Sequence, residues 1–338
     1  MSFLNHTKSM SYTAGDRAVI ASILLLTASV VLPIVSAQTN VGAAGEPCVS
    51  SAMVRLLARE GNSVRVSPST ELVSQKTGSR ENEKGIALTQ VPDTARTLQE
   101  AHTWFEKGAR KGYAPAQVNL AILSLAGWGT PQNAVTALYW LREAARQGYA
   151  LAYFDLGILY LQGCGVRQDY HEAFSQFEQG ANAGDSAAQM NLGYLYDQGL
   201  GVARDRTQAA VWYRKAAENG VAQAQYNLAD LYVRGEGVPL DENTAFAWFQ
   251  KAAQQGHTGA RIMLGSMYAE GRGTEKNPQS AYAWISAASL QGDTRGAESL
   301  QALERQLTPD QLAKSKMRAQ LLAQVPKPRS DAEVALFR

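Results

Sequence analysis

The sequence predicts an all-α fold, an α-solenoid built from helix-turn-helix repeats with a period of 36 residues. Two series in the same frame establish that period. The first is a glycine series, Gly112, Gly148, Gly184, Gly220, Gly256 and Gly292, and the second is a leucine series, Leu120, Leu156, Leu192, Leu228 and Leu264. A fixed period of this length is typical of stacked supersecondary units. Such a stack offers a long surface to other molecules, so the period favours binding over catalysis.

Residues 1–37 have the pattern of a signal peptide. Lys8 and Arg17 precede an apolar stretch that ends at Val35. Val35 and Ala37 stand at the −3 and −1 positions that signal peptidase reads, so we expect cleavage after Ala37. This predicts a periplasmic or secreted protein. The alternative is a protein anchored to the inner membrane by an uncleaved segment, because the stretch is close to the minimum length of a span.

Residues 38–93 lack the period, and we expect them to form a flexible N-terminal tether. Ser, Thr, Gly and charged residues dominate 67–84, and such a composition buries too little apolar surface to fold alone. Cys48 lies in this tether, whereas Cys164 lies in a turn of the repeats. The two can pair in an oxidising compartment, but the sequence leaves their proximity open.

Residues 94–293 hold the repeats, a half-unit followed by five complete units. In the copy from Ala188 to Val221, a first helix carries an apolar stripe at helical spacing and ends at a Gly-x-Gly turn. We expect positive φ angles or close backbone approaches at these glycines. The pairs are Gly127/Gly129, Gly163/Gly165, Gly199/Gly201, Gly235/Gly237 and Gly271/Gly273.

A capped second helix is predicted after each turn. Residues able to cap a helix N-terminus stand in frame at Thr97, Asn133, Asp169, Asp205, Asp241 and Asn277. Thr97 with Glu100, and Asp169 with Glu172, also fit the spacing of a capping box. An in-frame tryptophan is expected to fill the gap between units, at Trp104, Trp140, Trp212, Trp248 and Trp284. The first glycine series then ends each second helix at its C-cap.

Residues 294–323 are predicted to form C-terminal capping helices. Thr308 and Pro309 indicate the start of a last helix that runs to about Ala323. Its exposed positions are polar, as the end of a solenoid requires. Residues 324–338 are predicted to be a disordered tail.

One copy resembles a Sel1-like repeat, a relative of the tetratricopeptide repeat. The resemblance rests on AQYNLADLY at 224–232, GEGV at 235–238, AFAWFQKAA at 245–253 and Gly256. It extends over about 97–293. The resemblance implies a right-handed α-solenoid that works as an adaptor or scaffold.

The sequence shows no motif typical of a catalytic or metal-binding site. It contains no Ser-x-x-Lys, Gly-x-Ser-x-Gly or His-Glu-x-x-His motif. His102 and Glu106 lie one helical turn apart, but two ligands alone rarely hold a metal. We therefore expect no enzymatic activity, no metal and no cofactor. The alternative, from family analogy alone, is a cell-wall or β-lactam hydrolase or binding protein.

The charge balance gives no sign of nucleic-acid binding. The formal net charge is +2 over 338 residues, and no basic stripe crosses the repeats. We expect a protein or peptide partner, no nucleic acid, and no membrane contact beyond the signal segment.

Ten positions on the repeats are the candidate binding residues. By similarity to tetratricopeptide repeats, the residue before the in-frame leucine faces a concave groove, where an Asn amide can pair with an extended peptide. Neighbouring positions whose residues differ from one repeat to the next are added to this series. The predicted groove residues are then Asn119, Phe154, Asp155, Asn191, Tyr194, Gln198, Tyr226, Asn227, Asp230 and Arg234. The alternative is that the Asn residues bond locally and the aromatic residues belong to the core.

Overall fold

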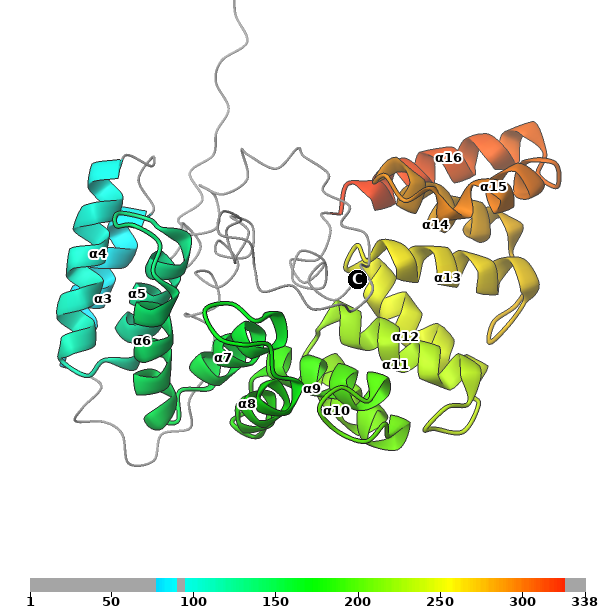
Figure 1. Cartoon of the computed structure of the whole chain (residues 1–338). Coiled ribbons are helices and arrows are strands. Elements are labelled where there is room, and N and C mark those ends of the chain that lie inside the picture. Colours follow the sequence, from blue (N-terminus) through cyan, green and yellow to red (C-terminus); the bar gives the residue numbers. More distant parts are fainter. Residues whose placement is uncertain (1–76, 90–94, 326–338) are drawn as a thin grey trace, which may run out of the picture. The chain divides into compact units, whose positions relative to one another are not determined.

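The computed structural model describes residues 77–89 and 95–325 (Figure 1). Every regular element in this part of the chain is a helix, so the predicted all-α class is confirmed. The chain divides after Tyr149 into two compact units, which are described separately.

The first unit contains two helix hairpins in which each helix packs on the next. Its helices are α3 (Ser79–Thr89), α4 (Ala95–Arg110), α5 (Ala114–Ala126) and α6 (Ala134–Arg146). The helix α3 corrects the prediction of a tether over 38–93, because the end of that range is helical and packs on α4. The expected half-unit that begins with α4 is therefore a hairpin whose first helix is α3.

The second unit stacks four hairpins and two further helices (Figure 1). The first helices of the hairpins are α7 (Ala150–Gln162), α9 (Ser186–Gln198), α11 (Ala222–Arg234) and α13 (Thr258–Glu270). The second helices are α8 (Tyr170–Asn182), α10 (Arg206–Glu218), α12 (Glu242–Gln254) and α14 (Pro278–Leu290). A short 3₁₀ helix, η3 (Thr294–Gly296), leads into α15 (Ala297–Glu304) and α16 (Pro309–Ala323), and α16 packs on α14. The first helices begin 36 residues apart, which confirms the predicted period.

The paired glycines form the turns as predicted. Gly199 and Gly201 both have a φ of 70°, and the other four pairs are likewise left-handed. A Cβ at Gly201 would lie 2.0 Å from the carbonyl oxygen of Tyr170, the first residue of α8. The second glycine of the turn therefore allows one hairpin to approach the backbone of the preceding one.

The predicted N-caps are confirmed at five of their six positions. Side chains of Asn133, Asp169, Asp205, Asp241 and Asn277 accept hydrogen bonds from backbone N–H groups in the first turn. Thr97 is not a cap, because α4 begins at Ala95 and includes it. The capping box of Asp169 is also incomplete, since the N–H of Asp169 donates to the carbonyl of Tyr160 instead of to Glu172.

The large side chain that fills the core is in most repeats not the predicted tryptophan but the residue after it. This buried series is Phe105, Leu141, Phe177, Tyr213, Phe249 and Ile285, none more than 2% exposed. Four of the five tryptophans are only half-buried, and lysine ammonium groups lie over the rings of Trp104, Trp212 and Trp248. Successive residues of a helix point about 100° apart, so of two adjacent large residues one usually faces the neighbouring helices more fully. In α14, where α16 also packs, both Trp284 and Ile285 are buried.

A ladder of amide side chains links successive hairpins, and the sequence reasoning missed it. Nε2 of Gln225 donates to the carbonyl of Ala217 at 3.0 Å, and Oε1 of Gln225 accepts from Gln255 at 2.8 Å. The same bonds recur 36 residues earlier, at Gln189. In the last hairpin the fully buried Arg261 takes this place, and its Nη2 donates to the carbonyl of Leu322 at 2.7 Å. Arg261 thereby fixes α16 against the stack.

The C-terminal helices follow the prediction at Thr308, whose side chain caps α16 in a complete capping box with Gln311. Residues 1–37, most of the expected tether, and 326–338 lie outside the described residues, as does Cys48. Cys164 is buried, with 3% of its surface exposed. Among the helices described, none is long and apolar enough to span a bilayer.

Candidate functional site

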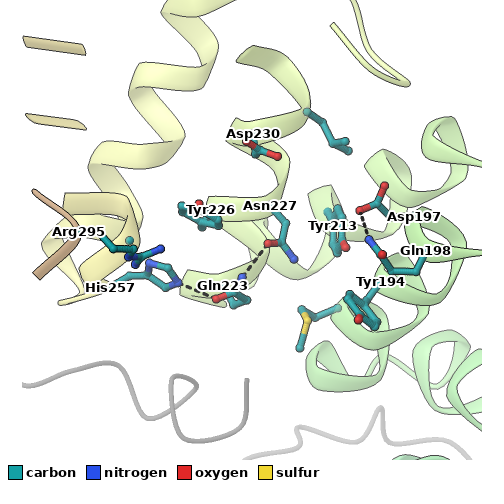
Figure 2. A pocket seen from close by; sticks show the side chains of 13 residues that line it. Tyr194, Asp197, Gln198, Tyr213, Gln223, Tyr226, Asn227, Asp230, His257 and Arg295 are labelled. Atoms are coloured by element: carbon teal, nitrogen blue, oxygen red, sulfur yellow. Dashed lines mark hydrogen bonds between the residues drawn. The ribbon is translucent and has the colours of Figure 1, made fainter. Parts of the chain in front are cut away.

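A pocket of about 230 Å³ lies in the second unit, over the first helices α9, α11 and α13 (Figure 2). Its lining comes from the middle and end of α9, from Tyr213 of α10, from α11, from the start of α13 and from η3. The lining residues are Met190, Tyr194, Asp197, Gln198, Tyr213, Gln223, Tyr226, Asn227, Asp230, Leu231, His257, Gly259 and Arg295.

A directed chain of hydrogen bonds crosses the pocket, starting at His257. Nδ1 of this residue caps α13 by accepting from the backbone N–H of Ala260 at 3.0 Å. A ring nitrogen that accepts a hydrogen bond carries no proton, so the neutral ring holds its proton on Nε2. Nε2 then donates to Oε1 of Gln223 at 2.6 Å, and Nε2 of Gln223 donates to Oδ1 of Asn227 at 2.7 Å.

The orientation of both amide groups follows from this chain. Gln223 and Asn227 accept through their oxygens, and Asn227 then bonds to the buried hydroxyl of Tyr213. A primary amide has two N–H donors, and the chain of bonds uses one from each residue. The middle of the pocket can therefore offer N–H donors to a ligand.

One end of the pocket is formed by Tyr226, His257, Gly259 and Arg295. The rings of Tyr226 and His257 stack, with centroids 4.8 Å apart (Figure 2). A Cβ at Gly259 would lie 3.2 Å from Cε1 of His257 and 3.4 Å from Nη2 of Arg295, so the glycine keeps this end open.

Arg295 is held in place by a bidentate bond to Asp293. Nε of Arg295 lies 2.9 Å from Oδ1, and Nη2 lies 2.6 Å from Oδ2. This guanidinium lowers the pKa of Asp293, and the carboxylate in turn raises the pKa of Arg295. The pair fixes the orientation of a cationic group at this end of the pocket.

The opposite end carries the carboxylates of Asp197 and Asp230. Asp197 accepts from Nε of Arg206 at 3.1 Å and from Nε2 of Gln198 at 3.0 Å. Asp230 pairs with Arg234 at 3.0 Å, but burial outweighs that pairing and raises the pKa of Asp230. This end is therefore acidic at its surface.

Two phenols share the acidic end. Burial raises the pKa of Tyr194, and it raises the pKa of the fully buried Tyr213 well above its ordinary value. The Asp197 carboxylate raises the pKa of both further, because a negative charge nearby disfavours a phenolate. Both phenols thus remain neutral hydrogen-bonding groups beside the carboxylates.

The structure gathers five of the ten predicted groove residues in this pocket: Tyr194, Gln198, Tyr226, Asn227 and Asp230. Arg234 does not line it but pairs with Asp230. Asn119 lies in the first unit, where its amide donates to Asn82 at 2.9 Å.

Phe154, Asp155 and Asn191 are buried, at 4%, 1% and 1% exposure, which corrects their predicted place on a groove surface. The reason is clearest for Asn191, whose Nδ2 donates to the carbonyl of Ala187 in its own helix at 2.8 Å. It bonds locally, as the alternative interpretation of these asparagines expected.

The sequence reasoning missed several polar residues of the pocket, chiefly Asp197, Gln223, His257 and Arg295. A signal for Gln223 was present, since it lies one helical turn before Asn227 on the same face of α11. Arg295 lies after the last complete repeat, so the period gave no hint of it. Within the described residues, no three His, Cys, Asp or Glu side chains gather as a metal site would require.

The comparisons with known proteins agree with the fold. The family model described as Sel1 repeat matches residues 84–113, 114–149, 150–185, 186–221, 222–257 and 259–293. The first match includes part of α3, as its packing on α4 suggests. No curated protein matches the chain.

Among the solved structures that are similar to this chain are two with at least 27% sequence identity. A Sel1 repeat protein from Oxalobacter formigenes is 34% identical, with a TM-score of 0.56 over 63% of this chain and 86% of that one. A protective antigen of uropathogenic Escherichia coli strains that displays an SLR fold is 27% identical, with a TM-score of 0.50 over 78% of this chain. This chain covers 64% of that antigen.

Proposed function

This chain belongs to the Sel1 repeat family, and from that premise we propose that it is a non-enzymatic adaptor that captures a peptide segment of a partner protein in the pocket over α9, α11 and α13. Proteins of this family are typically scaffolds for protein interaction. The proposal adds a location for binding and a class of ligand.

The observation that carries the proposal is the pair of oriented amides, Gln223 and Asn227. They lie four residues apart on the same face of α11, and Nε2 of Gln223 donates to Oδ1 of Asn227 at 2.7 Å. The two amides therefore form one compact group, in which each keeps a second N–H beyond the one used in the chain of bonds. Such a group can donate to a backbone carbonyl of a peptide segment.

The surroundings of these amides also suit a peptide. The aromatic rings of Tyr194 and Tyr226 supply contact area on either side, while the amides orient the backbone. His257 holds the Gln223 oxygen, so the donor direction is set before the ligand arrives. A preorganised site avoids part of the cost of ordering side chains on binding.

A binding test uses a degenerate pool of capped nonapeptides and the purified repeat protein. We expect the wild type to enrich a subset of the pool, and the double variant Gln223→Ala, Asn227→Ala to lose that enrichment. The matched control is Gln208→Ala, Asn243→Ala, which removes the same two amides from exposed positions on α10 and α12. No enrichment by the wild type, or equal enrichment by the pocket variant, would overturn the proposal.

We also propose that the protein is exported. The support is the sequence pattern alone: Lys8 and Arg17 before an apolar stretch, then Val35 and Ala37. N-terminal sequencing of the protein from envelope fractions should give a chain that starts at Gln38. A chain that keeps its first residues in the membrane fraction would support the anchored alternative, and recovery from the cytoplasm would overturn export.

A further inference from the structure

The two pocket carboxylates occupy positions that are otherwise mostly apolar in the repeats. Asp197 is in frame with Leu125, Leu161, Val233 and Ala269. Asp230 is in frame with Ile122, Ile158, Tyr194 and Ser266. The two exceptions occur in adjacent hairpins, and both carboxylates line the same pocket.

Placing carboxylates there costs stability. The side chains of Asp197 and Asp230 are only 20% and 26% exposed, so both lose much of their hydration. The raised pKa of Asp230 is a direct sign of that cost. Uncharged residues occupy these positions in the other hairpins, so the repeat fold does not need the charges. Charges that a fold does not need, gathered in a pocket, point to a ligand.

The arginines that pair with these carboxylates, Arg206 and Arg234, are not part of the pocket lining. Within the lining, Asp197 accepts from Nε2 of Gln198, which is an uncharged group. Arg206 also binds Oε1 of Glu236 at 2.8 Å, so it stays paired if Asp197 turns to a ligand. The side chain of Arg234 is 57% exposed, so water can hydrate its guanidinium if Asp230 turns from it to a ligand.

We propose that the captured peptide carries a lysine or arginine whose cationic end is seated between Asp197 and Asp230. This inference rests on the proposed function, because it names the side chain that the pocket selects. The stem of such a residue is apolar and fits against Tyr194, Met190 and Leu231, which line the same region. The half-buried ring of Tyr194 lines the pocket, and the π face of an aromatic ring attracts a cation.

The other end of the pocket gives the peptide a direction. Arg295 repels a second basic side chain there, although Asp293 balances part of its charge. A basic residue is therefore favoured at one end of the bound segment only, with the amides of Gln223 and Asn227 between the two ends.

The test compares two pools of capped nonapeptides that differ only at the central residue, lysine in one and the uncharged, similarly shaped norleucine in the other. Fluorescence polarisation with the full chain should show the lysine pool binding at least about tenfold more tightly, as expected for a desolvated charge pair. The variant Asp197→Asn, Asp230→Asn should bring this ratio close to one while the affinity for the norleucine pool stays the same. Each ratio is measured within one protein sample, so a variant that is partly unfolded still gives a valid ratio.

The control variant is Glu106→Gln in α4. Glu106 pairs with Arg110 four residues away, just as Asp230 pairs with Arg234, so the variant removes a comparable carboxylate outside the pocket. This variant should bind the lysine pool more tightly than the norleucine pool by the same factor as the wild type. Equal binding of both pools by the wild type, abolished by Gln223→Ala with Asn227→Ala, would overturn the basic anchor and leave the proposed function standing. A lysine preference that survives in Asp197→Asn, Asp230→Asn would also overturn it. Failure of both pools to bind would overturn this inference and the proposed function together.

Discussion

Gly193 of α9 lies against the ring of Tyr213 of α10, and a Cβ at Gly193 would come within 2.7 Å of Cδ1 of that ring. The same pairing recurs in frame between Gly157 and Phe177. The missing side chain on the first helix makes room for the large side chain on the second. In the pocket hairpin it also holds the phenol of Tyr213 where Asn227 can reach it.

The substitution Gly193→Ala tests this packing. Alanine favours helix by about 1 kcal/mol over glycine, but overpacking a buried contact typically costs about 1–3 kcal/mol. Since the added Cβ meets a fully buried ring, we expect a net loss in the free energy of unfolding, measured by urea denaturation. A gain in stability would show that the ring can shift aside at no cost.

Removing the buried ring of Phe249 should destabilise the protein more than removing the neighbouring indole of Trp248. Phe249 is fully buried, so Phe249→Ala is expected to cost about 3–5 kcal/mol. Trp248 is half-buried, with Lys251 Nζ 3.9 Å from its ring centroid, so Trp248→Ala should cost less. Urea melts of both variants make the comparison, and the reverse order would contradict the assignment of the core.

Loss of the N-cap of α10 should have a smaller effect. Oδ1 of Asp205 accepts from the N–H groups of Thr207 and Gln208, at 2.9 and 3.0 Å. Asp205→Ala is expected to cost about 0.5–2 kcal/mol, and Asp205→Asn much less, because asparagine is also a good cap. A loss as large as that of Phe249→Ala in the same urea assay would show that Asp205 does more than cap the helix.

The Asp293–Arg295 pair should make stability depend on pH in the acid range. The pair lowers the pKa of Asp293 below its ordinary value of 3.8, so the folded state favours the ionised carboxylate. Its contribution is therefore complete above that value and is lost as the pH falls through the folded pKa. The stability difference between wild type and Asp293→Asn should be constant from pH 7 to about pH 5 and shrink below about pH 4, in urea melts at each pH.

A matched control for that series is Asp310→Asn, which breaks an exposed pair with Lys314. Exposed pairs contribute little to the free energy of unfolding, so this variant should follow the wild type closely at every pH. If the advantage of wild type over Asp293→Asn persisted at the most acidic pH, the bidentate bond would not be its source.

The sequence allowed much of the fold to be predicted, because turns and caps depend on local chemistry. Gly199 and Gly201 need left-handed backbone, and Asp205 needs only the N–H groups of its own helix. The distinction between Trp248 and Phe249 could not be made in the same way. Both residues recur in frame, and which of them faces inward depends on how the helices rotate against one another.

The residues that line the pocket could be predicted only in part, because their surroundings also depend on how the helices pack. The period placed Tyr226, Asn227 and Asp230 on one helix face, and the structure brings them to the pocket. Asn191 is in frame with Asn227 one hairpin earlier, but it is buried and does not line the pocket. Residues at equivalent positions of the repeat therefore have different surroundings along the stack. Arg295 comes from beyond the last complete repeat, where no period can point to it.

The most direct test of peptide capture is to fill the pocket without removing any of its polar groups. Gly259→Leu places a side chain among Tyr226, His257 and Arg295, whereas Ala187→Leu makes a leucine at the same frame position of α9, outside the lining. The measurement is the affinity of a peptide enriched from the nonapeptide pool, by fluorescence polarisation, with helicity checked by circular dichroism. If the peptide binds in this pocket, Gly259→Leu weakens binding at least about tenfold and Ala187→Leu matches the wild type. Unchanged affinity in a folded Gly259→Leu protein would contradict peptide capture in this pocket.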